Sequence, residues 1–201
     1  MTFSTTSDNK ASPQALDDDL FAPSPRHPES RLEAEWLFLF NKLPPDQWFG
    51  ADYAYKTSGW LKVHTNIRKR QRILTQISTA YQSGEFGWNE YRSQILKRIN
   101  MHVLKLHQHH EVEDKGFFPE FVSMYPKLAP AFEILGHDHE YLNELLDKLQ
   151  IQNDQLARSE VEDKALAEEL HDTLVKVTDL LQQHLTDEED LVIPILGLRQ
   201  G

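Results

Sequence analysis

Residues 109–119, with the sequence HHEVEDKGFFP, share their spacing with residues 184–194, HLTDEEDLVIP. Each stretch begins with a histidine, has a glutamate four residues later, and ends with a proline six residues after that glutamate. His64 precedes the first stretch by 45 residues, and His139 precedes the second by the same interval. The chain therefore contains two copies of one unit displaced by 75 residues, and each copy is predicted to be a helical hairpin.

The apolar residues around these stretches recur at the spacing of amphipathic helices. They predict four long helices: from about residue 59 to 81, from 89 to 115, from Pro130 onward, and from a capping-box pattern at residues 159–162 onward. No segment alternates in the manner of a strand. The predicted fold class is therefore all-α, an up-and-down four-helix bundle.

Residues 1–57 differ in composition and are predicted to form an N-terminal extension, with the bundle occupying residues 58–201. Residues 1–28 are rich in Ser, Thr, Pro and Asp and lack periodicity, as expected of an irregular arm. A short amphipathic helix is predicted over residues 30–42. It should end before Pro44, because proline disfavours the helical conformation in the residue before it. An aromatic connector then leads into the bundle.

The composition restricts the partners that the chain can have. Its 21 Lys and Arg residues are outnumbered by 32 Asp and Glu residues, and the net charge of -11 argues against nucleic acids and anionic membranes. No apolar stretch is long enough to span a membrane, and the N-terminus lacks the pattern of a signal peptide, so a cytoplasmic protein is expected. The chain has no cysteine, so a metal site must use His, Asp or Glu.

Helix geometry predicts that the repeated residues meet. A histidine and a glutamate four residues apart leave the same face of a helix, one turn from each other. Each such pair lies in the last turns before a proline, where the helix is expected to end, whereas the lone histidines lie early in the first and third helices. These helix ends are neighbours in an up-and-down bundle, so the side chains should converge at one level. The six candidate metal ligands are His64, His109, Glu113, His139, His184 and Glu188.

The type and number of these ligands favour a pair of iron ions. Four imidazoles and two carboxylates buried without a metal would leave several polar groups unpaired. Iron, zinc, copper and manganese all accept these donors, but six ligands exceed the four of a tetrahedral zinc site. Two bridging carboxylates, two histidines per ion and an oxo or hydroxo bridge would give each iron five ligands and leave one position open. Another divalent metal could also occupy the site.

The chain resembles the hemerythrin-like, or HHE cation-binding, family over roughly residues 58–197. Besides the two histidine–glutamate stretches, the resemblance is carried by LKVH at residues 61–64 and GHDHEYL at residues 136–142. It implies a non-haem di-iron centre that binds oxygen, nitric oxide or peroxide.

One departure from that family bears on the chemistry. The family's oxygen carriers have a second histidine four residues after the one on the third helix, and here that position is Asn143. The missing nitrogen predicts a more open site, closer to family members that repair iron centres after nitrosative or oxidative stress. Those proteins usually carry an N-terminal cysteine-containing domain, and this chain has no cysteine.

Residues close to the candidate ligands have less specific predictions. His102 lies on the same helix face as His109 and could support a ligand from behind. Trp60 and Leu135, each one turn before a lone histidine, are expected to wall the open position or to be plain core. Three further histidines do not obey the repeat and are expected to be peripheral; they are His107, His110 and His137.

Several functions fit such a site. The leading hypothesis is a di-iron protein that binds or senses a diatomic or peroxide ligand, in oxidative or nitrosative stress. A di-iron enzyme that activates oxygen or removes peroxide is the second, and an iron store or donor for repair is the third. A ferritin-like oxygenase ranks lower, because those proteins use Glu-x-x-His rather than His-x-x-x-Glu. A redox protein partner is compatible with each, as is a monomer or homodimer.

Overall fold

The computed structural model describes residues 26–199, so most of the arm predicted over residues 1–28 lies outside the described residues. Between residues 26 and 199 the chain contains helices and no strand, which confirms the predicted all-α fold. None of these helices is both long and apolar enough to cross a membrane. The elements are η1 (Ala34–Phe38), η2 (Pro45–Gln47), α2 (Ala54–Gln82), α3 (Trp88–Leu96), α4 (Ile99–Val112), η3 (Glu113–Phe117), α5 (Phe118–Met124), η4 (Pro126–Leu128), α6 (Ala129–Arg158) and α7 (Lys164–Leu198).

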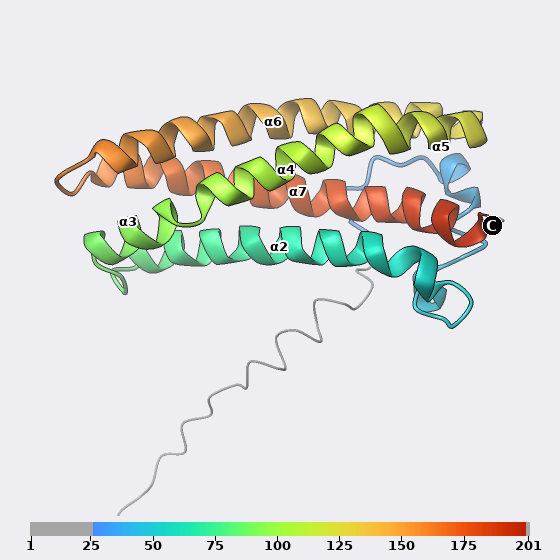
Figure 1. The fold of residues 1–201 in the computed structure, drawn as a ribbon, viewed down its shortest axis with the longest axis horizontal. Helices are drawn as coiled ribbons and strands as arrows, with labels where there is room; N and C mark the ends of the chain where they lie inside the picture. Colours follow the sequence, from blue (N-terminus) through green and yellow to red (C-terminus); the bar gives the residue numbers. More distant parts are fainter. Residues whose placement is uncertain (1–25, 200–201) are drawn as a thin grey trace, which may run out of the picture.

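Four helical columns form the bundle, and each runs antiparallel to the next along the chain (Figure 1). The column of α2 packs against α7 and α4, and α6 completes the ring by packing against the same two helices. α3, α4, η3 and α5 together follow the path of the second column. This is the predicted up-and-down topology.

The second column was predicted as one helix over residues 89–115, and this prediction is wrong because the column breaks between α3 and α4. At the break the guanidinium Nη1 of Arg98 donates to the carbonyl of Gln94, 2.9 Å away. The Arg98 amide, which would bond that carbonyl in a continuous α-helix, donates instead to Ile95. The side chain thus competes with the backbone for the same acceptor.

The two prolines do not end their helices, contrary to the prediction. Pro119 lies in the first turn of α5, directly after the π-helical turn η3, in which the amide of Phe118 donates to the carbonyl of Glu113. Pro194 lies inside α7, which continues to Leu198. Nearly every residue around Pro194 is buried, so tertiary packing holds the helix together across the missing hydrogen bond.

The last helix begins later than the capping-box pattern predicted. Ser159 is the C-cap of α6, and α7 begins after Asp163. The carboxylate of Asp163 accepts a hydrogen bond of 3.0 Å from the amide of Leu166, which is the usual role of an N-cap aspartate.

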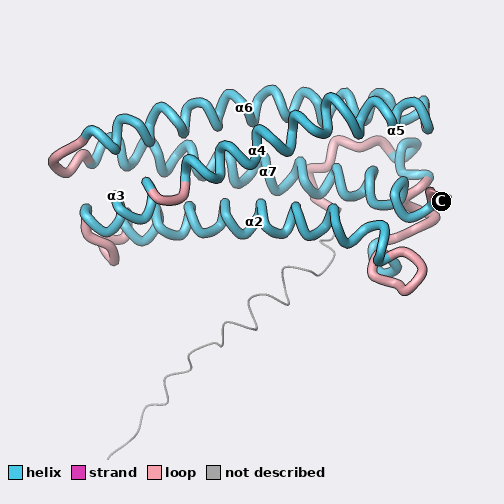
Figure 2. The backbone as a smooth tube through the Cα atoms, in the orientation of Figure 1, coloured by secondary structure: helices cyan, strands magenta, loops and turns pink. Residues whose placement is uncertain are grey.

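The described part of the extension packs against the bundle instead of standing apart from it (Figure 2). The helix predicted over residues 30–42 is shorter, since only the 3-10 turn η1 forms there. Leu32, Leu37 and Leu39 join an apolar cluster with residues of α5, α6 and α7. Leu43 joins a second one with Leu61 and Ile193, and a longer apolar core fills the remainder of the bundle.

Gly197 of α7 lies against Leu43 of the extension. A Cβ atom at this position would lie 2.3 Å from Cδ2 of Leu43, whose side chain is fully buried. Gly136, within α6, has no atom within 4 Å of the corresponding Cβ position.

Gly197→Ala should therefore lower the free energy of unfolding by about 1–3 kcal/mol, because the fully buried side chain of Leu43 must shift to make room for the new Cβ. Gly136→Ala is the matched control and should raise stability by up to about 1 kcal/mol through helix propensity. Urea unfolding of both variants measures the difference. Equal effects of the two substitutions would show that the extension is not tightly packed at Leu43.

Candidate metal centre

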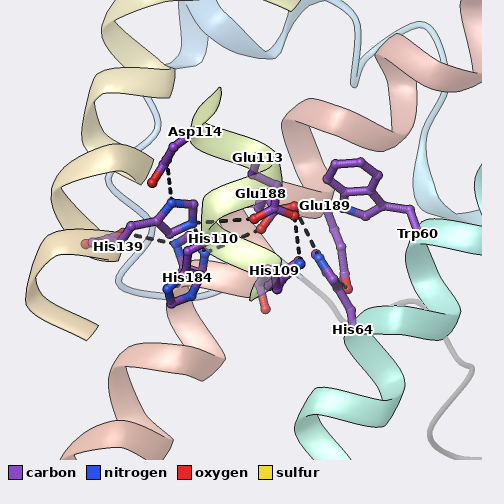
Figure 3. Close-up of polar contacts among 12 residues, drawn as sticks. Trp60, His64, His109, His110, Glu113, Asp114, His139, His184, Glu188 and Glu189 are labelled. Atoms are coloured by element: carbon purple, nitrogen blue, oxygen red, sulfur yellow. Dashed lines mark hydrogen bonds and ion pairs between the residues drawn. The ribbon is translucent and has the colours of Figure 1, made fainter. Parts of the chain in front are cut away.

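All six predicted ligands lie inside the bundle, in the half of it where α2 begins and α7 finishes (Figure 3). They lie farther from the helix ends than predicted, because the two prolines do not end their helices. The donor atoms of these six residues and of His110 fall into two groups, and within each group the atoms lie within 4.8 Å of one another. The His64 group consists of His64, His109, Glu113 and Glu188. The His184 group consists of His110, His139 and His184.

His110 is the residue that the repeat analysis misplaced. It was predicted to be peripheral, but its side chain is buried and its ring stacks on that of His139, with the centroids 4.2 Å apart. Its Nδ1 lies 2.9 Å from Oδ1 of Asn143. The amide at the position where a further histidine was missing therefore orients a histidine from α4. The repeat itself could have indicated that His110 is buried. A displacement of 75 residues pairs His110 with Leu185, an apolar residue that faces the interior.

The two glutamates connect the groups. Glu113 places Oε1 3.0 Å from Nδ1 of His109 and Oε2 3.6 Å from Nε2 of His139. Glu188 places Oε1 3.2 Å from Nε2 of His64 and Oε2 3.4 Å from Nε2 of His184. Each carboxylate thus offers one oxygen to each group, as a carboxylate that bridges two ions must.

Several donor atoms in this interior have no hydrogen-bond partner among residues 26–199. A buried polar atom without a partner costs free energy, so unpaired atoms converging at one place need another ligand. A cation satisfies lone pairs of imidazole and carboxylate at once, so the residues fit a metal site. The atoms are Nε2 of His109 and His110, and, with only the ion-pair contacts given above, Nε2 of His64 and one oxygen each of Glu113 and Glu188.

Residues 56–197 match the family described as the hemerythrin HHE cation-binding domain. The chain belongs to this family. The match confirms the resemblance expected over residues 58–197, and its cation-binding description agrees with the two groups of His and Glu. Comparisons with curated proteins and with solved structures found no significant match.

In this hemerythrin-family chain, Nδ1 of His64 and Nδ1 of His139 each have a carboxylate partner. Such partners fix the tautomer and the orientation of a ligand histidine. Nδ1 of His64 lies 2.9 Å from Oε1 of Glu189, and Nδ1 of His139 lies 2.7 Å from Oδ1 of Asp114. The repeat predicted a role for neither acid.

The electrostatics of the His64 group show how the metal-free protein balances its charges. Burial acts to lower the pKa of His64, but Glu188 and Glu189 outweigh it and raise that pKa to about 9. Burial lowers the pKa of His109 to about 3. Burial also opposes ionisation of Glu188, yet His64 holds the pKa of this carboxyl well below its usual range. A proton on His64 thus compensates Glu188, and a metal ion would displace it.

A pocket of about 360 Å³ between α2 and α4 borders the His64 group. His109 and Glu113 line its buried part, whereas Val63 and Val112 are exposed at its rim. Trp60, predicted to be a wall residue, lines it too and donates from Nε1 to Oε1 of Glu188 at 2.7 Å. A larger pocket of about 600 Å³, between α2 and α7, is lined by none of the six predicted ligands or His110.

The remaining predictions near the site have mixed outcomes. Leu135 is plain core and lines no part of the 360 Å³ pocket. His137 is exposed, and His107 lies 3.4 Å from Asp147 outside both groups, so these two histidines are peripheral as expected. His102 does not support a ligand, because its Nε2 lies 2.8 Å from Oε1 of Gln71.

Burial, with a smaller contribution from the charge of Arg70, lowers the pKa of His102 to about 3. The unfolded chain takes up a proton on this histidine below a pH of about 6.5, whereas the folded chain does not, so stability falls as the pH drops. Between pH 7 and 5.5 the loss due to this residue is about 1 kcal/mol.

In metal-free protein, His102→Gln should reduce the loss of stability between pH 7 and 5.5 by that amount. Urea unfolding at the two pH values measures it. His137→Gln, at an exposed position, is the control and should leave the pH dependence unchanged; an equal effect of both variants would contradict the assignment.

His110→Ala should lower the metal content of the loaded protein, because it takes one of three nitrogens from the His184 group and none from the His64 group. His137→Ala should not change the metal content. Metal analysis after gel filtration measures both. An unchanged metal content in the His110 variant would show that His110 is not a metal ligand.

Proposed function

We propose that this hemerythrin-family protein binds two iron ions and, at one of them, a small uncharged ligand: oxygen, nitric oxide or hydrogen peroxide. The observation that carries the proposal is the placement of Glu113 and Glu188, each with one oxygen toward either histidine group. Imidazole and carboxylate donors without thiolate suit iron. Carboxylate-bridged iron pairs in bundle cores have this chemistry.

The two ions would differ in their protein ligands. One would have His64 and His109, and the other would have the three histidines of the His184 group, with both glutamates shared. The first ion therefore has fewer nitrogen ligands, and we assign to it the free coordination position at which the small ligand would bind. Asn143 suggested an opening on the other side, but His110 supplies a nitrogen there.

The surroundings of the first ion favour an uncharged ligand. The 360 Å³ pocket ends at His109 and Glu113, and Val63, Val112 and Phe117 give it an apolar lining. An apolar passage admits a neutral diatomic molecule or hydrogen peroxide more readily than an anion. A bound iron pair supplies reversible coordination of such ligands, with a change in iron oxidation state. A role in oxidative or nitrosative stress follows from these ligands.

Anaerobic purification followed by metal analysis should give two irons per chain, and exposure to oxygen or nitric oxide should change the near-ultraviolet and visible spectrum. Glu113→Ala and Glu188→Ala should each reduce the content of both ions, because each removes a shared ligand. Glu111→Ala is the matched control, since Glu111 is an exposed glutamate two residues from Glu113. One iron per chain, or two irons with a silent spectrum, would refute the proposal.

Val112→Phe should narrow the pocket and slow nitric oxide association several-fold without changing the iron content. Val175→Phe is the control, because Val175 is a part-exposed valine on α7 that does not line the pocket. Stopped-flow measurements give the association rates. Equal rates in both variants would show that the ligand enters elsewhere.

A further inference from the structure

A segment of the extension, residues 26–32, lies against α7 beside the His184 group. Nε2 of Gln183 donates to the carbonyl of Glu29 at 2.7 Å, and the amide of Arg31 donates to Oδ2 of Asp187 at 3.3 Å. This segment lies outside residues 56–197, the part of the chain that matches the family. Its contacts with the site are therefore a property of this chain's own extension.

The side chain of Arg31 reaches a carboxylate that faces a proposed ligand. Its Nη2 hydrogen-bonds to Oδ1 of Asp138 on α6. The other oxygen, Oδ2 of Asp138, lies 3.6 Å from Nδ1 of His184. Neither of these two atoms has a hydrogen-bond partner among the described residues, so they are available to each other.

The other half of the site contains the same three-part arrangement. Arg68 on α2 donates from Nη1 and Nη2 to the carboxylate of Glu189, at 2.5 and 3.1 Å. Oε1 of Glu189 lies 2.9 Å from Nδ1 of His64. In both halves, an arginine thus contacts a buried carboxylate, which in turn faces a ligand histidine. In one half the arginine belongs to the bundle, and in the other it comes from the extension.

The chemistry of such an arrangement is well defined. A carboxylate behind a ligand histidine orients the ring and increases its basicity, and its loss typically weakens metal binding 10–100-fold. The Asp138 side chain is 5% exposed, and a carboxylate this buried needs a cationic partner to stay ionised and in place. Arg31 supplies that partner.

We propose that Arg31 is a positioning residue of the metal centre, which acts through Asp138 on His184 so that the N-terminal extension controls how long the iron of the His184 group stays bound. This inference rests on the proposed function, because it requires an ion at His184. The extension is then a part of the metal site and more than a cover for the bundle.

The experiment follows the release of iron(II) from anaerobically loaded full-length protein to a coloured chelator. In Arg31→Ala one of the two irons should leave about tenfold faster, while the other keeps its wild-type rate. Arg31→Lys retains the charge and should restore part of the slow release. Arg68→Ala should accelerate the loss of the other iron.

Arg199→Ala is the matched control. The Arg199 side chain pairs with Glu120 at 2.7 Å and is 47% exposed, which is close to the 45% of the Arg31 side chain. Its loss should leave both release rates unchanged. Acceleration of iron release by this control would show that any lost surface ion pair has the same effect, which would overturn the proposal.

A double variant tests whether Arg31 acts through Asp138. Asp138→Asn should accelerate release as Arg31→Ala does, and combining the two should add nothing further. Independent effects that multiply, or a wild-type release rate in Arg31→Ala, would overturn the inference while leaving two bound irons and the proposed function intact. A wild-type protein that holds fewer than two irons would refute both.

Discussion

The structure depends on the burial of four consecutive acidic side chains, residues 187–190 of α7, inside the bundle. A buried carboxylate is very costly unless it has donors or cations around it. Each of the four meets such a group, two of them from the extension and two from α2. Asp187 accepts from the extension, Glu188 from Trp60, Glu189 from Arg68, and Asp190 lies 3.7 Å from Arg26. The positions of the surrounding elements are consistent with this requirement.

This requirement explains why the extension and the bundle behave as one body. α7 is buried on all sides around Glu188 because the extension covers its outer face with Leu32, Leu37 and Leu43. The same segment brings the charge of Arg26 to Asp190 and the backbone amide of Arg31 to Asp187. Apolar contacts and contacts with the buried acids thus hold the extension in one place. The apolar side chains of the extension also shield the buried acids from water.

Much of the fold and most of the site could be predicted from the sequence. The helical period and the repeat of 75 residues placed the six predicted ligands in one interior region, because helix spacing alone determines which side chains share a face. His110 was not predicted as a ligand, because its counterpart in the repeat is Leu185, which has no ligand atom. A search for histidines that recur in both copies therefore excludes His110. The extension's contacts at Asp138 and Asp187 depend on a loop path that no local pattern specifies. The π turn and the helix across Pro194 likewise depend on tertiary packing.

The sharing of ligands between the repeats has a consequence for the order of assembly. The His64 group needs Glu188, and the His184 group needs His184, so both wait for α7, the last helix of the bundle to be synthesised. A nascent chain that ends before α7 therefore lacks both complete coordination spheres. A cation held by both groups can therefore bind only after α7 has been synthesised.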